Sequence, residues 1–268
     1  MAASSSNPAF NRSPAFSNVP AVAKRLETPT AEQLDELYAR SSSSRADTEP
    51  MTYEDTIRKV VIAFVVLLLG AAVGWFIPIL FIPAAIAGLV LGLVNTFKKM
   101  PSRGLILAYA AVEGVFVGGI SYFFNGFYEG IVPQAVFGTL GVVGVVLVLF
   151  ANGKVRASKR ATKVFLVAMI GYAVFSLINF VLMISGTTEG MYGLRSVTIG
   201  GIPLGIPLGI LVIFMAAYSL VLDFDSIKTG VQRGAPRIFA WQAAFGVMVT
   251  VVWLYLEILR LIGLIRSN

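Results

Sequence analysis

Four acidic side chains fall within or at the ends of long apolar stretches: Glu113, Asp223, Asp225 and Glu257. An ionisable group inside a membrane is costly unless it meets a partner or water, so such residues indicate a structural pair or a pathway for ions or protons. The chain has no histidine and no cysteine. This excludes a Ser-His-Asp triad and a thiolate metal site, and it leaves proton chemistry to carboxylates, lysines and tyrosines. Oxygen ligands of this kind suit a hard cation such as Ca²⁺.

The positions of three of these acids predict different environments. Glu113 lies about nine residues into its apolar stretch, which places it roughly 14 Å deep, near the bilayer centre. It is either a protonated group bonded to a neighbouring helix or part of a pathway. Asp223 and Asp225 stand two residues apart, about 200° around a helix. We therefore expect one of them to point into the bundle and the other toward the membrane surface or Lys228.

Glu257 belongs to a stripe of polar or small residues on an otherwise apolar helix. The stripe has spacings of three and four residues and consists of Gln242, Gly246, Thr250, Trp253, Glu257 and Arg260. A face of this kind packs on other helices or meets water. Two interpretations stay open. Glu257 forms an ion pair with Arg260, which is three residues away, or it faces another carboxylate, so that the two share a proton and respond to pH.

The elements that must position these residues are membrane spans. Apolar residues make up 57% of the 268 residues and charged residues only 13%, which is typical of an integral membrane protein. We predict an all-α bundle of seven transmembrane helices over 51–268, following a disordered cytoplasmic tail over 1–50. The connection between the first two spans is very short, so we expect these spans to form a tight helical hairpin. The predicted spans are 60–77, 79–97, 104–124, 131–151, 164–184, 203–224 and 239–265.

Basic residues alternate between the loops. The loops after the second, fourth and sixth spans hold three, five and three Lys or Arg, whereas those after the first, third and fifth hold zero, zero and one, Arg195. Because positive loops stay cytoplasmic, the pattern predicts a cytoplasmic N-terminus and an outside C-terminus. It also accounts for the net charge of +7 without a nucleic-acid partner.

Two segments resemble a known family. The sequence WLYLEILR (residues 253–260) is similar to a Leu-Tyr-Leu-Asp motif, and LDFDSI (residues 222–227) to a Tyr-Asp-Thr-Gln-x-Ile motif, of the Bax inhibitor family, also called transmembrane BAX inhibitor motif proteins. The closest likeness is to its long-tailed bacterial branch, which implies a location in the cell membrane of a bacterium. The resemblance implies a central last helix, a calcium leak, and a proton-sensitive latch of two aspartates, here Asp223 and Glu257. These two would contact Ca²⁺, with Asp225, Glu113 and Arg260 along the same pathway.

The main prediction is therefore a pH-sensitive calcium leak channel gated by an acidic pair between spans six and seven. We expect no enzymatic activity, because no lysine accompanies the serines inside the spans to form a Ser-Lys dyad. No cofactor is expected either. Its partners are the lipid bilayer and Ca²⁺. One alternative is a regulatory protein that binds and restrains another membrane protein, such as a protease, through the tail. Another is a proton-coupled transporter.

Overall fold

The computed structural model describes residues 49–188 and 190–267. Within these residues, seven helical segments are long and apolar enough to cross a membrane, which confirms the predicted seven-span, all-α fold. The predicted tail lies, up to residue 48, outside the described residues. The helices are α4 (Tyr53–Phe76), α5 (Phe81–Phe97), α6 (Arg103–Phe127), α7 (Ile131–Ala151), α8 (Lys159–Ile184), α9 (Gly205–Gln232) and α10 (Phe239–Arg266).

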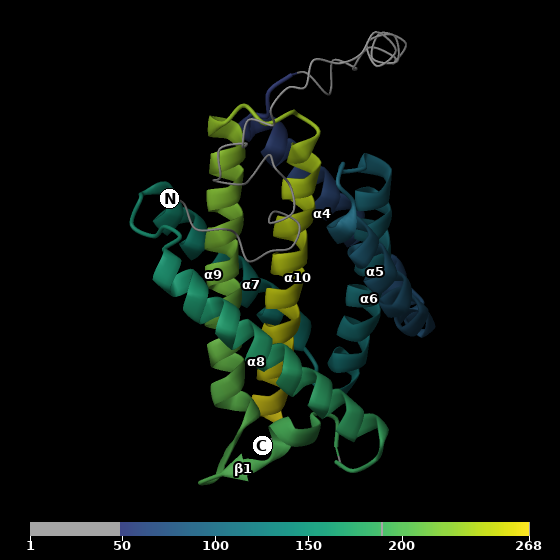
Figure 1. The fold of residues 1–268 in the computed structure, drawn as a ribbon. Coiled ribbons are helices and arrows are strands. Elements are labelled where there is room, and N and C mark those ends of the chain that lie inside the picture. Colours follow the sequence, from purple (N-terminus) through teal and green to yellow (C-terminus); the bar gives the residue numbers. More distant parts are fainter. Residues whose placement is uncertain (1–48, 189, 268) are drawn as a thin grey trace, which may run out of the picture.

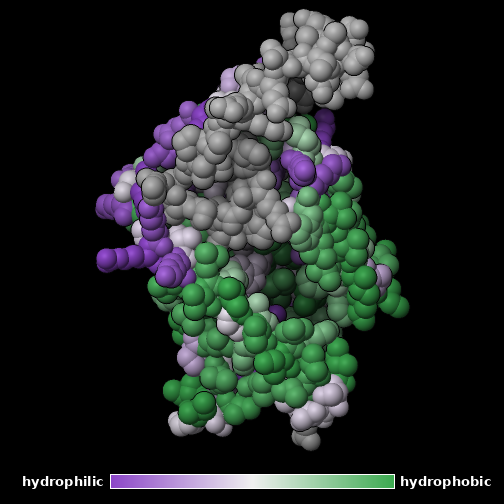
Figure 2. Space-filling model, in the orientation of Figure 1, coloured by the Kyte–Doolittle hydropathy of each residue, from purple (hydrophilic) through white to green (hydrophobic). Residues whose placement is uncertain are grey.

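The bundle has two chemically different ends (Figure 1). We call one the basic end, formed by residues 49–52 and by the loops 98–102, 152–158 and 233–238. The other is the hairpin end, formed by residues 185–188 and 190–204 and by the described C-terminus. It contains the short helix η2 (Gly193–Ser196) and the antiparallel strands β1 (Thr198–Ile199) and β2 (Ile202–Pro203). On the face seen in Figure 2, hydrophobic residues cover the middle of the molecule and hydrophilic residues gather toward the basic end.

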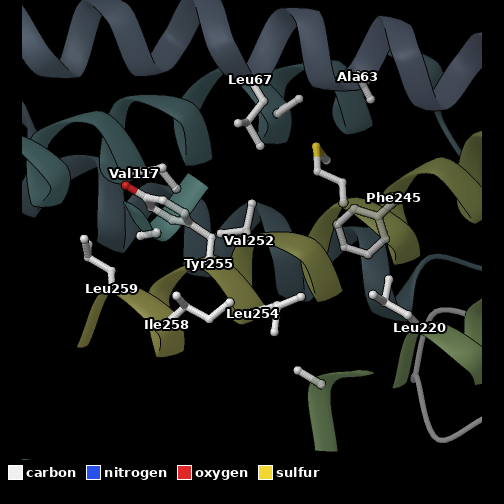
Figure 3. Packing of buried hydrophobic residues seen from close by; sticks show 14 of the residues in the cluster. Ala63, Leu67, Val117, Leu220, Phe245, Val252, Leu254, Tyr255, Ile258 and Leu259 are labelled. Carbon is white, nitrogen blue, oxygen red and sulfur yellow. The ribbon is translucent and has the colours of Figure 1, made fainter. Parts of the chain in front are cut away.

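Helix α10 is the centre of the bundle. More than half of its most apolar stretch is buried, against about a tenth for α8, and it packs on α4, α6, α7 and α9. Its side chains Val252, Leu254 and Leu259 are buried in the main core, together with residues of α4, α6 and α9 (Figure 3). A central position suits this helix because its apolar faces and its polar stripe all meet protein instead of lipid.

Helix α6 is the common partner of α4 and α5. A side chain on Gly114 would overlap the carbonyl oxygen of Leu67, and one on Gly118 would overlap that of Ala71, so α4 and α6 are in backbone contact, as small residues four apart permit. Helix α5 also packs on α6 but makes few contacts with α4. The prediction of a tight hairpin between the first two spans is therefore wrong, because the small-residue faces of both helices turn toward α6.

Several helices extend beyond the predicted apolar spans. Helix α4 begins at Tyr53, seven residues before the predicted apolar span, and the hydroxyl of Thr52 accepts a hydrogen bond of 3.2 Å from the amide of Asp55. Such a hydroxyl caps the helix, because it satisfies an amide of the first turn. Helix α9 continues to Gln232. Asp223 therefore lies within the helix, nine residues before its end, instead of at the close of the span as the sequence boundaries suggested.

A polar clamp at the basic end holds the loop between α9 and α10. The guanidinium of Arg237 lies 2.9 Å from a carboxylate oxygen of Asp55 and 2.6 Å from one of Glu49. Hydrogen bonds to Asp55 and Glu49 raise the pKa of Arg237 above its ordinary value, so the group stays charged. The ammonium of Lys59 donates to Asp55 and to the carbonyl of Arg237. The start of α10 is thereby tied to the start of α4.

Candidate functional site

Asp223 is a carboxylate in the interior of the bundle. Its exposed fraction is 0%, and one oxygen accepts a hydrogen bond of 2.6 Å from the hydroxyl of Thr250 on α10. The Thr250 oxygen lies 3.5 Å from the hydroxyl of Ser219, one turn away on α9. Because Thr250 gives its proton to Asp223, its oxygen is free to accept one from Ser219. The result is a line of three polar groups that joins α9 to α10.

Asp225 occupies a different environment from Asp223. It is only partly buried, and the charges of Lys228 and Arg156 act on it. The two aspartates point to different sides of α9, as a rotation of about 200° between them requires. Only Asp223 therefore faces the helices of the core.

Glu257 is buried at the centre of a second polar cluster. Its exposed fraction is 2%. One carboxylate oxygen lies 2.5 Å from Arg260 and accepts a short hydrogen bond from the hydroxyl of Tyr172, while the other lies 3.3 Å from Arg195. Tyr172 also accepts a hydrogen bond of 2.8 Å from Arg195. We call Tyr172, Arg195, Glu257 and Arg260 the arginine cluster.

The loop after α8 delivers Arg195 to this cluster. In α8, the side-chain oxygen of Asn179 accepts a hydrogen bond of 2.7 Å from the amide of Leu194. Gly193 has a positive φ of 55°, and a Cβ there would lie 2.5 Å from that same oxygen, so only glycine fits the turn. A Cβ on Gly205 would lie 2.9 Å from the Cβ of Arg195. The 3-10 helix η2 is thus pressed between α8 and α9, and the guanidinium of Arg195 points into the bundle.

Glu113 lies apart from both groups, beside a hollow between α5, α6 and α10. A cavity of about 400 Å³ there is lined by Glu113 and Tyr109 of α6 and by Phe245 of α10. A Cβ on Gly88 of α5 would lie 2.8 Å from a carboxylate oxygen of Glu113, so the glycine makes room for the acid. Figure 2 shows a hollow on this face, between α10 and the pair α5 and α6, surrounded mostly by hydrophobic surface.

The structure does not bring Asp223 and Glu257 together. Thr250 is the α10 residue bonded to Asp223, and Glu257 comes seven residues later, about 10 Å along the helix. The short loop between antiparallel α9 and α10 explains this register. Asp223 is nine residues from the end of α9 and Thr250 is eleven from the start of α10, whereas Glu257 is eighteen from it. The acidic pair is thus replaced by an Asp223–Thr250 pair and a Glu257–Arg260 ion pair.

Sequence reasoning missed three of the residues that form these sites. Thr250 was noted only as part of a stripe, and Tyr172 and Arg195 were given no role. Arg195 did carry a signal, because it is the only Lys or Arg in the loops after the first, third and fifth spans. Tyr172 carried none, since a tyrosine in an apolar helix is common. Among the described residues, no group of three or more acidic side chains converges on one point.

Comparison with known proteins adds one match. A family model described as Bax inhibitor 1 like matches residues 7–267, nearly the whole chain. A search of the curated proteins gives no match.

Proposed function

The chain belongs to the Bax inhibitor 1 like family, and on that premise we propose that it is a calcium leak channel whose opening depends on the protonation of Asp223. The observation that carries the proposal is the position of this carboxylate. It is fully buried between the two most buried helices, and a hydroxyl is its hydrogen-bond partner on α10. A carboxylate held in this way inside a membrane protein is typical of ion and proton pathways.

Protonation changes what Asp223 can do for its neighbours. The ionised carboxylate accepts a charge-assisted hydrogen bond from Thr250 and carries a negative charge that attracts a cation. The protonated acid carries no charge, and its own O–H is a donor. The bond that joins α9 to α10 is then weaker, and the cation has lost its counter-charge. One proton therefore alters both the contact between the helices and the electrostatics of the pathway, without a second carboxylate.

The orientation follows from the charges at the ends of the bundle. We propose that the basic end faces the cytoplasm of a bacterial cell and the hairpin end faces outward, as the excess of Lys and Arg in the basic-end loops favours. In this orientation the arginine cluster lies toward the outside of the membrane and the Arg237 clamp toward the inside.

Calcium flux in liposomes tests the proposal. The full chain is reconstituted, and Ca²⁺ uptake is followed with an enclosed dye at several pH values. We expect flux above that of protein-free liposomes, with a pH dependence that Asp223→Asn abolishes, since asparagine copies the uncharged acid. Asp225→Asn is the matched control on the same helix and should keep the wild-type profile. Absence of flux at every pH contradicts the proposal and favours a regulatory membrane protein instead.

A further inference from the structure

The arginine cluster lines a cavity that the proposed function does not use. The cavity has a volume of about 470 Å³ and lies between α8 and α10, with η2 at one side. Helix α8 crosses α9 and α10 obliquely (Figure 1) and packs on its neighbours less than the other helices do. The space is therefore a gap between a peripheral helix and the central one, at the hairpin end of the bundle.

The charges in this cavity do not balance. Arg195 and Arg260 share a single carboxylate, that of Glu257, which leaves an excess of one positive charge. The side chains of Arg195 and Glu257 are only 6% and 3% exposed, and that of Arg260 is 35% exposed. A buried charge without a counter-charge is strongly unfavourable, so a site with this composition favours an anion.

The hydrogen-bond donors are also in excess. The two guanidiniums have about ten N–H donors between them, and within the described part of the chain they form four side-chain hydrogen bonds, all to Glu257 or Tyr172. The hydroxyl of Ser176, which lines the same cavity, is buried and has no hydrogen-bond partner among the described residues. A ligand that fits must offer several acceptor oxygens.

We propose that this cavity binds an anion bearing a phosphate group, held by Arg195 and Arg260 with Ser176 as a further donor. Guanidinium and phosphate match in geometry and charge, because planar N–H pairs meet two oxygens at once. Free phosphate and a phospholipid headgroup share this chemistry. Phe180 and Trp253 give the cavity an apolar side on which an acyl chain can lie. The proposal does not rest on the calcium leak.

Substitution of Glu257 distinguishes an anion site from a cation site, because the two sites predict opposite changes in affinity. In an anion site this carboxylate competes with the ligand for the two arginines, so Glu257→Gln should tighten binding several-fold. In a calcium site the same substitution should remove a ligand and weaken binding. A gain of affinity cannot come from a variant that fails to fold, which separates this outcome from a structural defect.

The experiment is a calorimetric titration of the purified full chain in a phosphate-free detergent. One titrant is inorganic phosphate and the other is a short-chain phosphatidylglycerol. We expect at least one to bind. Arg260→Gln should weaken that binding about ten-fold or more, as loss of a charged hydrogen-bond donor does. Arg266→Gln, on the last turn of the same helix, should leave it unchanged.

The two titrants identify the source of the phosphate. Binding of inorganic phosphate supports a free anion as ligand, and binding of the lipid alone supports a headgroup. If neither titrant binds to the wild-type chain or to Glu257→Gln, the proposal is overturned. Weaker binding by Glu257→Gln than by the wild type also overturns it.

Discussion

Thr250 places a hydroxyl against Asp223 in the interior of the membrane domain. The two side chains are 0% and 3% exposed, and the bond between them is 2.6 Å long. Thr139 offers a comparison, because it is also buried, on α7, and among the described residues its hydroxyl bonds to the backbone carbonyl of Ala135 and to no carboxylate. The two threonines therefore differ in the group that accepts their hydrogen bond. For Thr250 it is a buried carboxylate, and for Thr139 it is a helix carbonyl.

Removing the Thr250 hydroxyl should therefore destabilise the protein. Thr250→Val keeps the shape of the side chain but leaves Asp223 without this donor, which costs about 1–3 kcal/mol. Thr139→Val should cost little. Thermal unfolding of the two variants in detergent measures the difference. Equal midpoints for both variants would show that the Asp223–Thr250 bond contributes nothing to stability.

At the level of residues, the sequence identifies which acids are unusual but not what they contact. Asp223 and Glu257 stand out because charge is rare in apolar helices. Their partners depend on the register between α9 and α10. The sequence does not define this register, so a residue of one helix could face any of several residues on the other. The Glu257–Arg260 pair was one of two open interpretations because both residues belong to one helix. The contact of Asp223 with Thr250 and that of Glu257 with Arg195 each join two different segments of the chain, so neither could be predicted.

Among the helices, the contact between α4 and α6 depends on glycine. On both sides a Cβ would run into the backbone of the other helix, as at Gly74 of α4 and Gly118 of α6. A spacing of four residues between small residues permits close packing but does not identify the partner, which the structure identifies as α6 for both α4 and α5. Helix α7 has Gly141, around which nothing lies within 4 Å of a Cβ. This residue provides a control on a helix of similar composition.

Gly118→Ala should separate α4 from α6 and lower stability. The added methyl would overlap backbone atoms of Ala71, which cannot move aside as a flexible side chain can, so we expect a loss of about 1–3 kcal/mol or more. Gly141→Ala should have almost no effect. Unfolding midpoints in detergent provide the comparison, and a Gly118→Ala protein as stable as Gly141→Ala would contradict the backbone contact.

For the whole molecule, the seven spans could be predicted from hydropathy and length. A segment inside the membrane must satisfy its own backbone hydrogen bonds, so each long apolar segment is expected to be a helix. The ends of the helices were less predictable, since α4, α8 and α9 continue past their apolar segments with polar residues that hydropathy assigns to loops. The central position of α10 was expected only from the family resemblance, and the order of the helices around it was not predicted. Long-range packing of this kind depends on side-chain shape, which hydropathy does not report.

The orientation of the bundle can be tested with single cysteines, because the chain has none of its own. Asn152→Cys lies at the basic end and Ser185→Cys at the hairpin end, and both positions are exposed. We expect a membrane-impermeant maleimide to label Ser185→Cys in intact cells and Asn152→Cys only after permeabilisation. The opposite pattern would reverse the proposed orientation.

The central claim is that Asp223, and not Glu257, is the group whose protonation controls calcium flux. The most direct test compares the pH profile of Ca²⁺ flux through Asp223→Asn and Glu257→Gln in the same liposomes, after thermal unfolding has shown that both variants fold. We expect a flat profile for Asp223→Asn and a wild-type pH dependence for Glu257→Gln. A flat profile for Glu257→Gln beside a pH-dependent Asp223→Asn would contradict it.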